Sequence, residues 1–311
     1  MSKKNLIIGA ITKYNINQLK PWVLSINEVT DKTTTHKVMI VGDITSETRK
    51  WLIDNDFKLI EIYKSDSHKP LTSQWIIRTD IKLSNKKYTR IPIHVARFLY
   101  IYECLRNEWE KYDYVVTTDV KDVYFQTDPF KWLNINLGEP WKLVAATESL
   151  KYKDEPWNSK NLEKAYNPYV YDLFKNNEIY NVGIIGGRAE YVKDLAFNIF
   201  MNAVNRPIAV VDQAVFNVLI NTLPFKDIVK FLKQCDGWAC QAGASVDPSV
   251  FQTFKPLLLE AEPIWKDAMV LTGQDGAKTL KGTPFCMVHQ YDRVPEWNNY
   301  VQSKFGCGDN K

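Results

Sequence analysis

The first sixty residues alternate strand-like and helix-like segments, and this alternation constrains the fold more than any other feature of the chain. Apolar, strand-like runs at 6–12, 37–41 and 57–62 are separated by amphipathic stretches at 17–28 and 45–55. Three strands joined by two helices predict a mainly parallel sheet with helices on its faces, an α/β fold. The 311 residues suffice for one large domain, and no Pro- or Ser-rich linker divides them. We therefore expect a single domain, residues 1–311, with an irregular C-terminal half.

The segment from residue 65 to residue 87 is polar and without a clear period, which is typical of a long surface loop. Periodicity then returns. The patterns predict helices at 92–105, 162–174 and 189–202 and a helix opening at Asp212, strands at 112–118, 143–147, 181–187 and 285–289, a short helical turn at 129–132 and a loop at 151–161.

Charge and cysteine usage exclude several classes of protein. The net charge of +4 is small for this length, so it favours small anionic ligands and gives no reason to expect a nucleic-acid partner. Five cysteines without regular spacing argue against a disulfide framework and for a reducing compartment. The apolar run near the N-terminus is too short for a signal peptide, and no stretch has the length of a membrane span. We expect a cytoplasmic protein.

Two carboxylates, Asp119 and Asp122, follow the β-branched strand that ends at Thr118. Acidic side chains at the carboxyl end of a buried strand lie where α/β proteins bind ligands. Oxygen ligands this close together suit a hard cation such as Mn²⁺ or Mg²⁺, which in turn suits phosphate. The alternative is a capped turn with a solvated acid, which is common after strands.

Two further strands carry polar groups that suit the same ligand. Asn181 begins a strand rich in glycine, and His289 ends the last apolar strand. Two aspartates and a histidine form a mixed oxygen and nitrogen set that suits Mn²⁺, and the metal can neutralise a diphosphate leaving group. Taken singly, His289 also fits a hydrogen-bonded core histidine, Arg97 a solvated arginine, and Asp212 the N-cap of its helix.

The order of these motifs resembles that of a known family. Ala96-Arg97, Asp119-Val-Lys-Asp122, Asn181-Val-Gly183, Asp212-Gln213 and Val288-His289 follow one another as in nucleotide-sugar glycosyltransferases of the GT-A fold. The layout is most similar to the retaining family 8 enzymes, which include glycogenin and the bacterial lipopolysaccharide galactosyltransferases. The resemblance covers residues 5–297. It departs from the family in two places: the aspartates are separated by two residues where Asp-x-Asp is usual, and Gln290-Tyr-Asp-Arg293 replaces a Gly and Lys-Pro-Trp ending.

The resemblance implies a donor site for a nucleoside-diphosphate sugar, with UDP favoured and GDP possible. Asp119, Asp122 and His289 would hold Mn²⁺ (or Mg²⁺), and Asp119 would also contact the ribose. The remaining donor-binding positions would be Ala10, Thr12 and Tyr14 around the nucleobase, with Arg97, Asn181, Gly183 and Arg293 around the diphosphate and the sugar. Residues 1–130 would form the nucleotide-binding half and residues 131–311 the acceptor-binding half.

The implied reaction transfers the sugar to an acceptor hydroxyl on a glycan or protein. Asp212 and Gln213 would face the donor sugar and the reacting centre. The resemblance favours retention of configuration, with Gln213 against the donor face. An inverting route needs a carboxylate that deprotonates the acceptor, which Asp212 or Glu148 could provide.

Three other functions share part of this pattern. A sugar-phosphate nucleotidyltransferase usually has a Gly-rich basic loop after its first strand, and Thr12-Lys-Tyr-Asn15 is not such a loop. A catalytically silent nucleotide-sugar-binding relative would not need both aspartates and His289. An aspartyl-phosphate phosphatase requires Asp-x-Asp after its first strand, whereas the acidic pair here follows the fourth.

Overall fold

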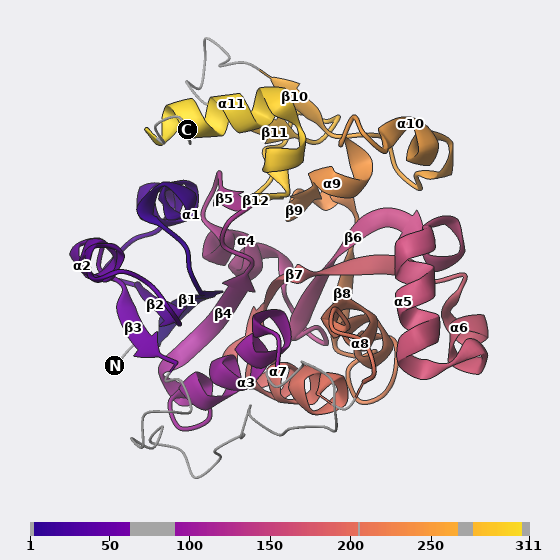
Figure 1. Ribbon diagram of the computed structural model, residues 1–311, viewed down its shortest axis with the longest axis horizontal. Helices are drawn as coiled ribbons and strands as arrows, with labels where there is room; N and C mark the ends of the chain where they lie inside the picture. Colours follow the sequence, from indigo (N-terminus) through magenta and orange to yellow (C-terminus); the bar gives the residue numbers. More distant parts are fainter. Residues whose placement is uncertain (1–2, 63–90, 205, 267–275, 307–311) are drawn as a thin grey trace, which may run out of the picture.

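The structure is a computed structural model that describes residues 3–62, 91–204, 206–266 and 276–306. The polar segment 65–87 and Cys307 lie outside these residues. A seven-stranded sheet with the order β3-β2-β1-β4-β7-β6-β8 forms the centre of the molecule (Figure 1). Its strands are β1 (Lys4–Ile11), β2 (Thr35–Val41), β3 (Lys58–Glu61), β4 (Tyr112–Thr118), β6 (Leu143–Lys151), β7 (Glu178–Arg188) and β8 (Val229–Leu232).

The sheet is mixed and mainly parallel, as the alternating opening predicts. β1 pairs in parallel with β2 and β4, β2 with β3, and β6 with β8. β7 runs antiparallel to its neighbours β4 and β6. The expectation of an α/β fold is therefore confirmed.

Helices cover both faces of the sheet because its strands are apolar on both sides. Leu6 and Ile8 of β1 lie in the core beneath α3 (Ile93–Leu105), α7 (Ala189–Ala203) and α8 (Asp212–Ile220). Ile7, between them, points to the other core, against α1 (Ile16–Val29), α2 (Ser46–Asp54) and α4 (Pro129–Asn136). This alternation is the two-residue period of a strand buried on both faces.

A second, three-stranded sheet adjoins the carboxyl end of β4. It has the order β5-β12-β9, with β5 (Val123–Phe125) antiparallel and β9 (Ala239–Gln241) parallel to the central strand β12 (Met287–His289). The strand β4 passes into β5 through a turn that carries the acidic pair. The C-terminal part adds α9 (Ala242–Ser245), α10 (Phe251–Phe254), β10 (Ile264–Lys266), β11 (Gly276–Lys278) and α11 (Pro295–Lys304), which lie together beyond the second sheet (Figure 1).

Two expectations about the segment 151–174 are wrong. The predicted loop at 151–161 contains the start of α5 (Pro156–Tyr166), because Glu155 accepts hydrogen bonds at the helix N-terminus and Pro156 occupies the first helical position. The predicted single helix at 162–174 is broken at Asn167, whose φ of 132° ends α5. Its side chain then caps α6 (Pro168–Phe174) by accepting the Val170 amide at 3.0 Å.

The short helical turn expected at 129–132 extends to residue 136 as α4. Among the helices of the described ranges, none combines the length and the apolar character needed to cross a membrane. Four cysteines, Cys104, Cys235, Cys240 and Cys286, are free thiols.

Candidate active site

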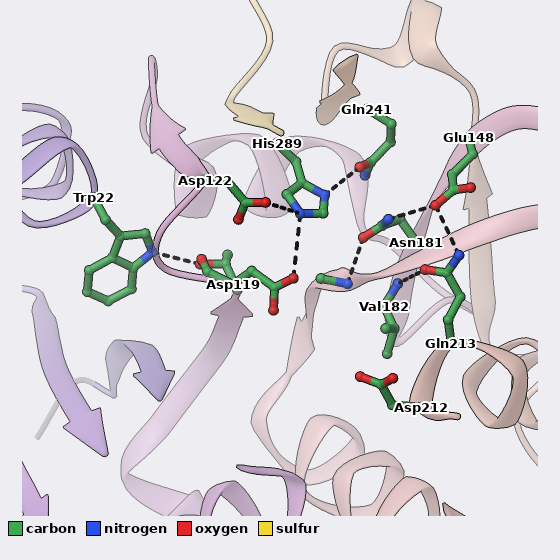
Figure 2. A network of polar contacts seen from close by, with 12 residues as sticks. Trp22, Asp119, Asp122, Glu148, Asn181, Val182, Asp212, Gln213, Gln241 and His289 are labelled. Carbon is green, nitrogen blue, oxygen red and sulfur yellow. Dashed lines mark hydrogen bonds and ion pairs between the residues drawn. The ribbon is translucent and has the colours of Figure 1, made fainter. Parts of the chain in front are cut away.

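The turn between β4 and β5 and the end of β12 bring three metal-ligand side chains together. His289 Nε2 lies 3.5 Å from Asp119 Oδ2 and 3.7 Å from Asp122 Oδ2. One potential ligand atom from each of the three residues lies within 4.8 Å of the others. The three side chains point toward one another (Figure 2). Those of Asp119 and Asp122 are 34% and 23% exposed, whereas that of His289 is 2% exposed. This triad is therefore open to solvent on its carboxylate side and closed behind the imidazole.

The hydrogen bond on the other ring nitrogen determines what His289 can do. Its Nδ1 lies 2.8 Å from Gln241 Oε1, which can only accept, so Nδ1 carries the proton and Nε2 presents a lone pair. Burial lowers the pKa of His289, and the Arg293 and Arg97 charges act in the same direction, against Asp122 and Glu148. A neutral imidazole therefore faces two carboxylates.

This arrangement fits a divalent cation. Nε2 of His289 is buried and has no hydrogen-bond partner among the described residues. A lone pair turned toward two ionised carboxylates is repelled unless a positive charge lies between them. The donor set of two carboxylates and one imidazole suits Mn²⁺. The amide of Gln241 then has the position of an outer residue that fixes the tautomer of a metal-binding histidine.

Gly183 leaves room for the triad. A Cβ atom added at this position would lie 2.7 Å from both Asp119 Oδ2 and His289 Cε1, closer than real Cβ atoms approach other heavy atoms. The Gly183 carbonyl also accepts the backbone N–H of Asp119 at 2.7 Å. The glycine in the sequence Asn181-Val-Gly183 is therefore required by close packing against the candidate metal ligands.

Arg97 ties the triad to α8. Its guanidinium forms an ion pair with Asp119 through Nη1 and with Asp212 through Nη2, the latter at 3.3 Å. The side chain of Arg97 is only 11% exposed, so the alternative interpretation of Arg97 as a solvated arginine is wrong. The interpretation of Asp212 as the N-cap of its helix is wrong as well. Val211 is the cap residue and Asp212 is the first residue of α8, where its carboxylate turns to Arg97 instead of the helix amides.

A second polar network lies beside the triad on β6, β7 and α8 (Figure 2). Asn181 donates to Glu148 Oε1 at 2.7 Å, and Gln213 donates to the same oxygen at 3.1 Å. The side-chain Oδ1 of Asn181 accepts the backbone N–H of Gly183 at 2.7 Å, which joins this network to the glycine beneath the triad. Burial raises the pKa of Glu148, while the hydrogen bond from Asn181 acts against this.

An irregularity in β6 turns Glu148 into this network. The pairing of β6 with β7 shifts register between Ala145 and Thr147 and again between Thr147 and Lys151. Ser149 lies at the irregularity with a φ of 59°, a conformation that is uncommon for a residue with a Cβ atom. Its hydroxyl accepts a hydrogen bond from Gln234 at 2.9 Å. Such bulges occur next to active sites because they redirect a side chain.

The other predicted donor-binding residues lie at the end of β1 and on the turns after β1 and β12. Burial raises the pKa of Tyr14 and the charge of Asp122 acts in the same direction, which places this phenol within electrostatic reach of the acidic turn. Arg293 is exposed on the turn after β12 and acts on the pKa of His289. Ala10 packs against the core at the end of β1, and Thr12 lies beside Gly42, each directly after the carboxyl end of its strand, β1 and β2.

Sequence patterns missed three contributors to the site. Gln241 lies opposite His289 in the β9–β12 register, but a glutamine in a short strand has no distinctive pattern. Asn158 bonds to Gln213 from α5, in a segment predicted to be a loop. Trp22 donates to the Thr118 hydroxyl at 2.7 Å, and that hydroxyl donates to the Asp119 carbonyl oxygen at 2.6 Å. The apolar spacing of α1 indicates only a core role for Trp22.

The order and pairing of the strands match the GT-A fold found in solved glycosyltransferases. Among solved structures, an active-site mutant of LgtC aligns with a TM-score of 0.55, 14% identity and coverage of 98% of this chain and 96% of that chain. The galactosyltransferase LgtC in complex with donor and acceptor sugar analogs aligns with a TM-score of 0.54 and 13% identity. The alignment covers 98% of this chain and 96% of that chain. The bifunctional glycosyltransferase WbbM in its apo form aligns with a TM-score of 0.52 and 12% identity. The alignment covers 98% of this chain but only 52% of WbbM, so this chain spans about half the length of WbbM. No protein-family model and no curated protein sequence matches the chain.

Proposed function

We propose that the protein is a glycosyltransferase that uses a divalent metal and a nucleoside-diphosphate sugar. The observation that carries this proposal is the triad of Asp119, Asp122 and His289, in which a buried, unprotonated imidazole nitrogen faces two carboxylates. Its place at the end of β4, within a fold shared with LgtC and WbbM, supports the same conclusion. LgtC was solved with donor and acceptor sugar analogs, which makes sugar transfer the most direct use of such a triad.

The three side chains of the triad would hold the cation, which when bound stabilises the negative charge of a departing diphosphate. The residues around it would bind and orient the donor. Arg97 holds Asp119 and Asp212 in fixed positions by its two ion pairs. Tyr14 lies near the acidic turn, where its ring can pack on the nucleobase. Arg293, exposed beyond β12, has the planar fork that binds phosphate oxygens in pairs. UDP is the favoured nucleotide, and GDP is the alternative.

The environment of the carboxylates supports retention of configuration. Inversion needs a carboxylate that is free to take the acceptor proton. Asp212 is paired with Arg97, and Glu148 accepts hydrogen bonds from two amides. Neither is positioned as an unengaged base. Gln213 instead presents an amide beside Glu148, Asn181 and Val182. We infer that the acceptor is a hydroxyl of a glycan or a glycosylated protein and that residues 131–311 supply most of its contacts.

The decisive experiment screens UDP- and GDP-sugars for slow hydrolysis with Mn²⁺, with Mg²⁺ and with EDTA. We expect turnover of at least one donor that requires the metal. The variant Asp122→Asn should lose turnover and metal-dependent binding of the free nucleoside diphosphate in calorimetry. Asp113→Asn is the matched control, because Asp113 lies near the start of β4, the strand that leads to Asp122, in a long ion pair with Arg188 at 3.8 Å.

Three outcomes would overturn the proposal. Absence of metal-dependent binding to either nucleotide would remove the donor site. Binding without turnover of any nucleotide-sugar would instead indicate a silent binding relative. Release of pyrophosphate from a nucleoside triphosphate and a sugar phosphate would indicate a nucleotidyltransferase.

A further inference from the structure

Asn158 connects the N-terminal cap of α5 to the side chain of Gln213. It is 5% exposed, and its two side-chain polar atoms have different partners. Its Nδ2 donates to Glu155 Oε2 at 2.8 Å, and its Oδ1 accepts from Gln213 Nε2 at 2.9 Å. A buried amide that satisfies one carboxylate and one amide in this way has a single favourable orientation, because a flip would place N–H against N–H and oxygen against oxygen.

Glu155 fixes that orientation from the helix end. Its Oε1 accepts the backbone N–H of Trp157 at 3.1 Å, and its Oε2 accepts that of Asn158 at 2.6 Å. The same Oε2 receives the Asn158 side chain. The carboxylate that caps α5 therefore also determines which atom of Asn158 faces Gln213.

The amide of Gln213 is constrained in turn. Its Nε2 donates to both Asn158 Oδ1 and Glu148 Oε1, so both of its N–H groups are used. Its Oε1 faces the backbone N–H of Val182 at 3.4 Å, on the strand that carries Asn181 and Gly183. Removal of the acceptor on Asn158 would leave one N–H of Gln213 unpaired and the amide free to rotate.

We propose that Asn158 and Glu155 are positioning residues for the transfer reaction, which hold the Gln213 amide in one orientation beside the reacting centre. The inference rests on the proposed glycosyltransferase function. It assigns to α5 a role in the rate of transfer that is separate from binding of the donor nucleotide. Among the described residues, neither the triad nor Arg97 shares a hydrogen bond or an ion pair with Glu155 or Asn158.

The test uses the full-length protein and four variants. Asn158→Asp keeps an oxygen for Gln213 but places a carboxylate against Glu155. Glu155→Gln keeps a carbonyl oxygen for the cap and supplies an N–H. The double variant can restore the connection with donor and acceptor exchanged. Asn161→Asp is the matched control on α5, because the Asn161 amide nitrogen has no hydrogen-bond partner in the described part of the chain. For each, kcat and KM for the donor sugar, the Kd of the nucleoside diphosphate with Mn²⁺, and Tm are measured.

We expect Asn158→Asp to lower kcat roughly ten- to hundredfold, the effect of a misplaced group near a reacting centre. KM and the nucleotide Kd should stay within about twofold of wild type by the same argument, since the metal triad is intact. The double variant should have a higher kcat than Asn158→Asp alone, a positive coupling that a merely destabilised helix would not give.

The inference is overturned if Asn158→Asp turns over donor like wild type, if Asn161→Asp loses as much kcat, or if the double variant is no faster than Asn158→Asp. A wild-type protein that turns over no nucleotide-sugar would overturn the proposed function, and the inference with it. Wild-type turnover together with any of the first three results would overturn the inference alone.

Discussion

A single hydrogen bond fixes which nitrogen of His289 faces the two aspartates. Gln241 Oε1 receives Nδ1–H at 2.8 Å, so the lone pair on Nε2 is the one turned to the candidate metal position. Outer residues of this kind typically change metal affinity by about 10–100-fold when they are removed. We therefore expect Gln241→Met, which keeps the side-chain volume, to weaken Mn²⁺ binding by about this factor in calorimetry. An unchanged Kd for Mn²⁺ would show that the tautomer does not depend on Gln241.

Glu148 gives a second prediction at this scale, on stability. Burial raises the pKa of this carboxyl above 4.5. The folded protein therefore holds the proton over a pH range in which the unfolded chain has lost it, and stability falls as the pH rises from 4.5 through the raised pKa. Gln at this position accepts the same two amides without a charge. We expect Glu148→Gln to be more stable than wild type by roughly 0.5–2 kcal/mol at pH 8, with the difference shrinking near pH 4.

Chemical denaturation at the two pH values measures this difference. A Glu148→Gln protein that is less stable at pH 8 would contradict it. The same variant also tests the stereochemical proposal. A retaining enzyme should keep measurable transfer, whereas an inverting enzyme with Glu148 as its base should lose it entirely.

At the level of elements, the irregularity in β6 determines where Glu148 points. Ser149 has a left-handed backbone conformation, which costs a residue with a Cβ atom about 1–2 kcal/mol. Ser149→Ala and Ser149→Gly remove the same hydroxyl, but only Gly adopts this backbone conformation without that cost. We expect the Gly variant to be the more stable of the two in urea denaturation, because the greater freedom of Gly in the unfolded chain offsets only about 0.4–1 kcal/mol. Equal midpoints would show that the backbone at this position is not strained.

Patterns in the sequence predict regular elements well and their interruptions poorly. The β1–β3 opening and α7 follow from apolar spacing over whole elements, because burial on one or both faces fixes that spacing. The start of α5 is not predicted, because Lys, Trp, Asn and Pro suggest a loop by composition, whereas the Glu155 cap and Pro156 start a helix. The break at Asn167 and the bulge at Ser149 depend on single φ angles, which leave no periodic signal.

The sequence predicts those residues of the candidate site whose own side chains could contact a ligand or metal. Asp119, Asp122, Asn181 and His289 end or begin apolar strands, and the structure brings them together. Arg97 and Asp212 lie there too. Their ion pair was not predicted, because an ion pair between two helices leaves no local pattern in the sequence. Asn158 and Gln241 contribute only through other side chains, and no spacing rule relates them to their partners.

At the scale of the whole molecule, the triad joins the two sheets. Asp119 and Asp122 lie in the turn from β4 to β5, and His289 ends β12 of the second sheet. A cation bound by all three would favour the folded state over the unfolded chain, by about 2.7 kcal/mol at about 100 times its Kd. We expect Mn²⁺ to raise the Tm of the wild-type protein and to leave that of His289→Gln unchanged in thermal denaturation. An equal rise in both proteins would place the cation elsewhere.

The position of His289 after every strand of the seven-stranded sheet also has a consequence for biosynthesis. A ribosome that has translated as far as Leu232 has produced every strand of the seven-stranded sheet and both aspartates. The third ligand and the strand that carries it are synthesised only later. A nascent chain that has not yet reached His289 therefore lacks one of the three candidate metal ligands.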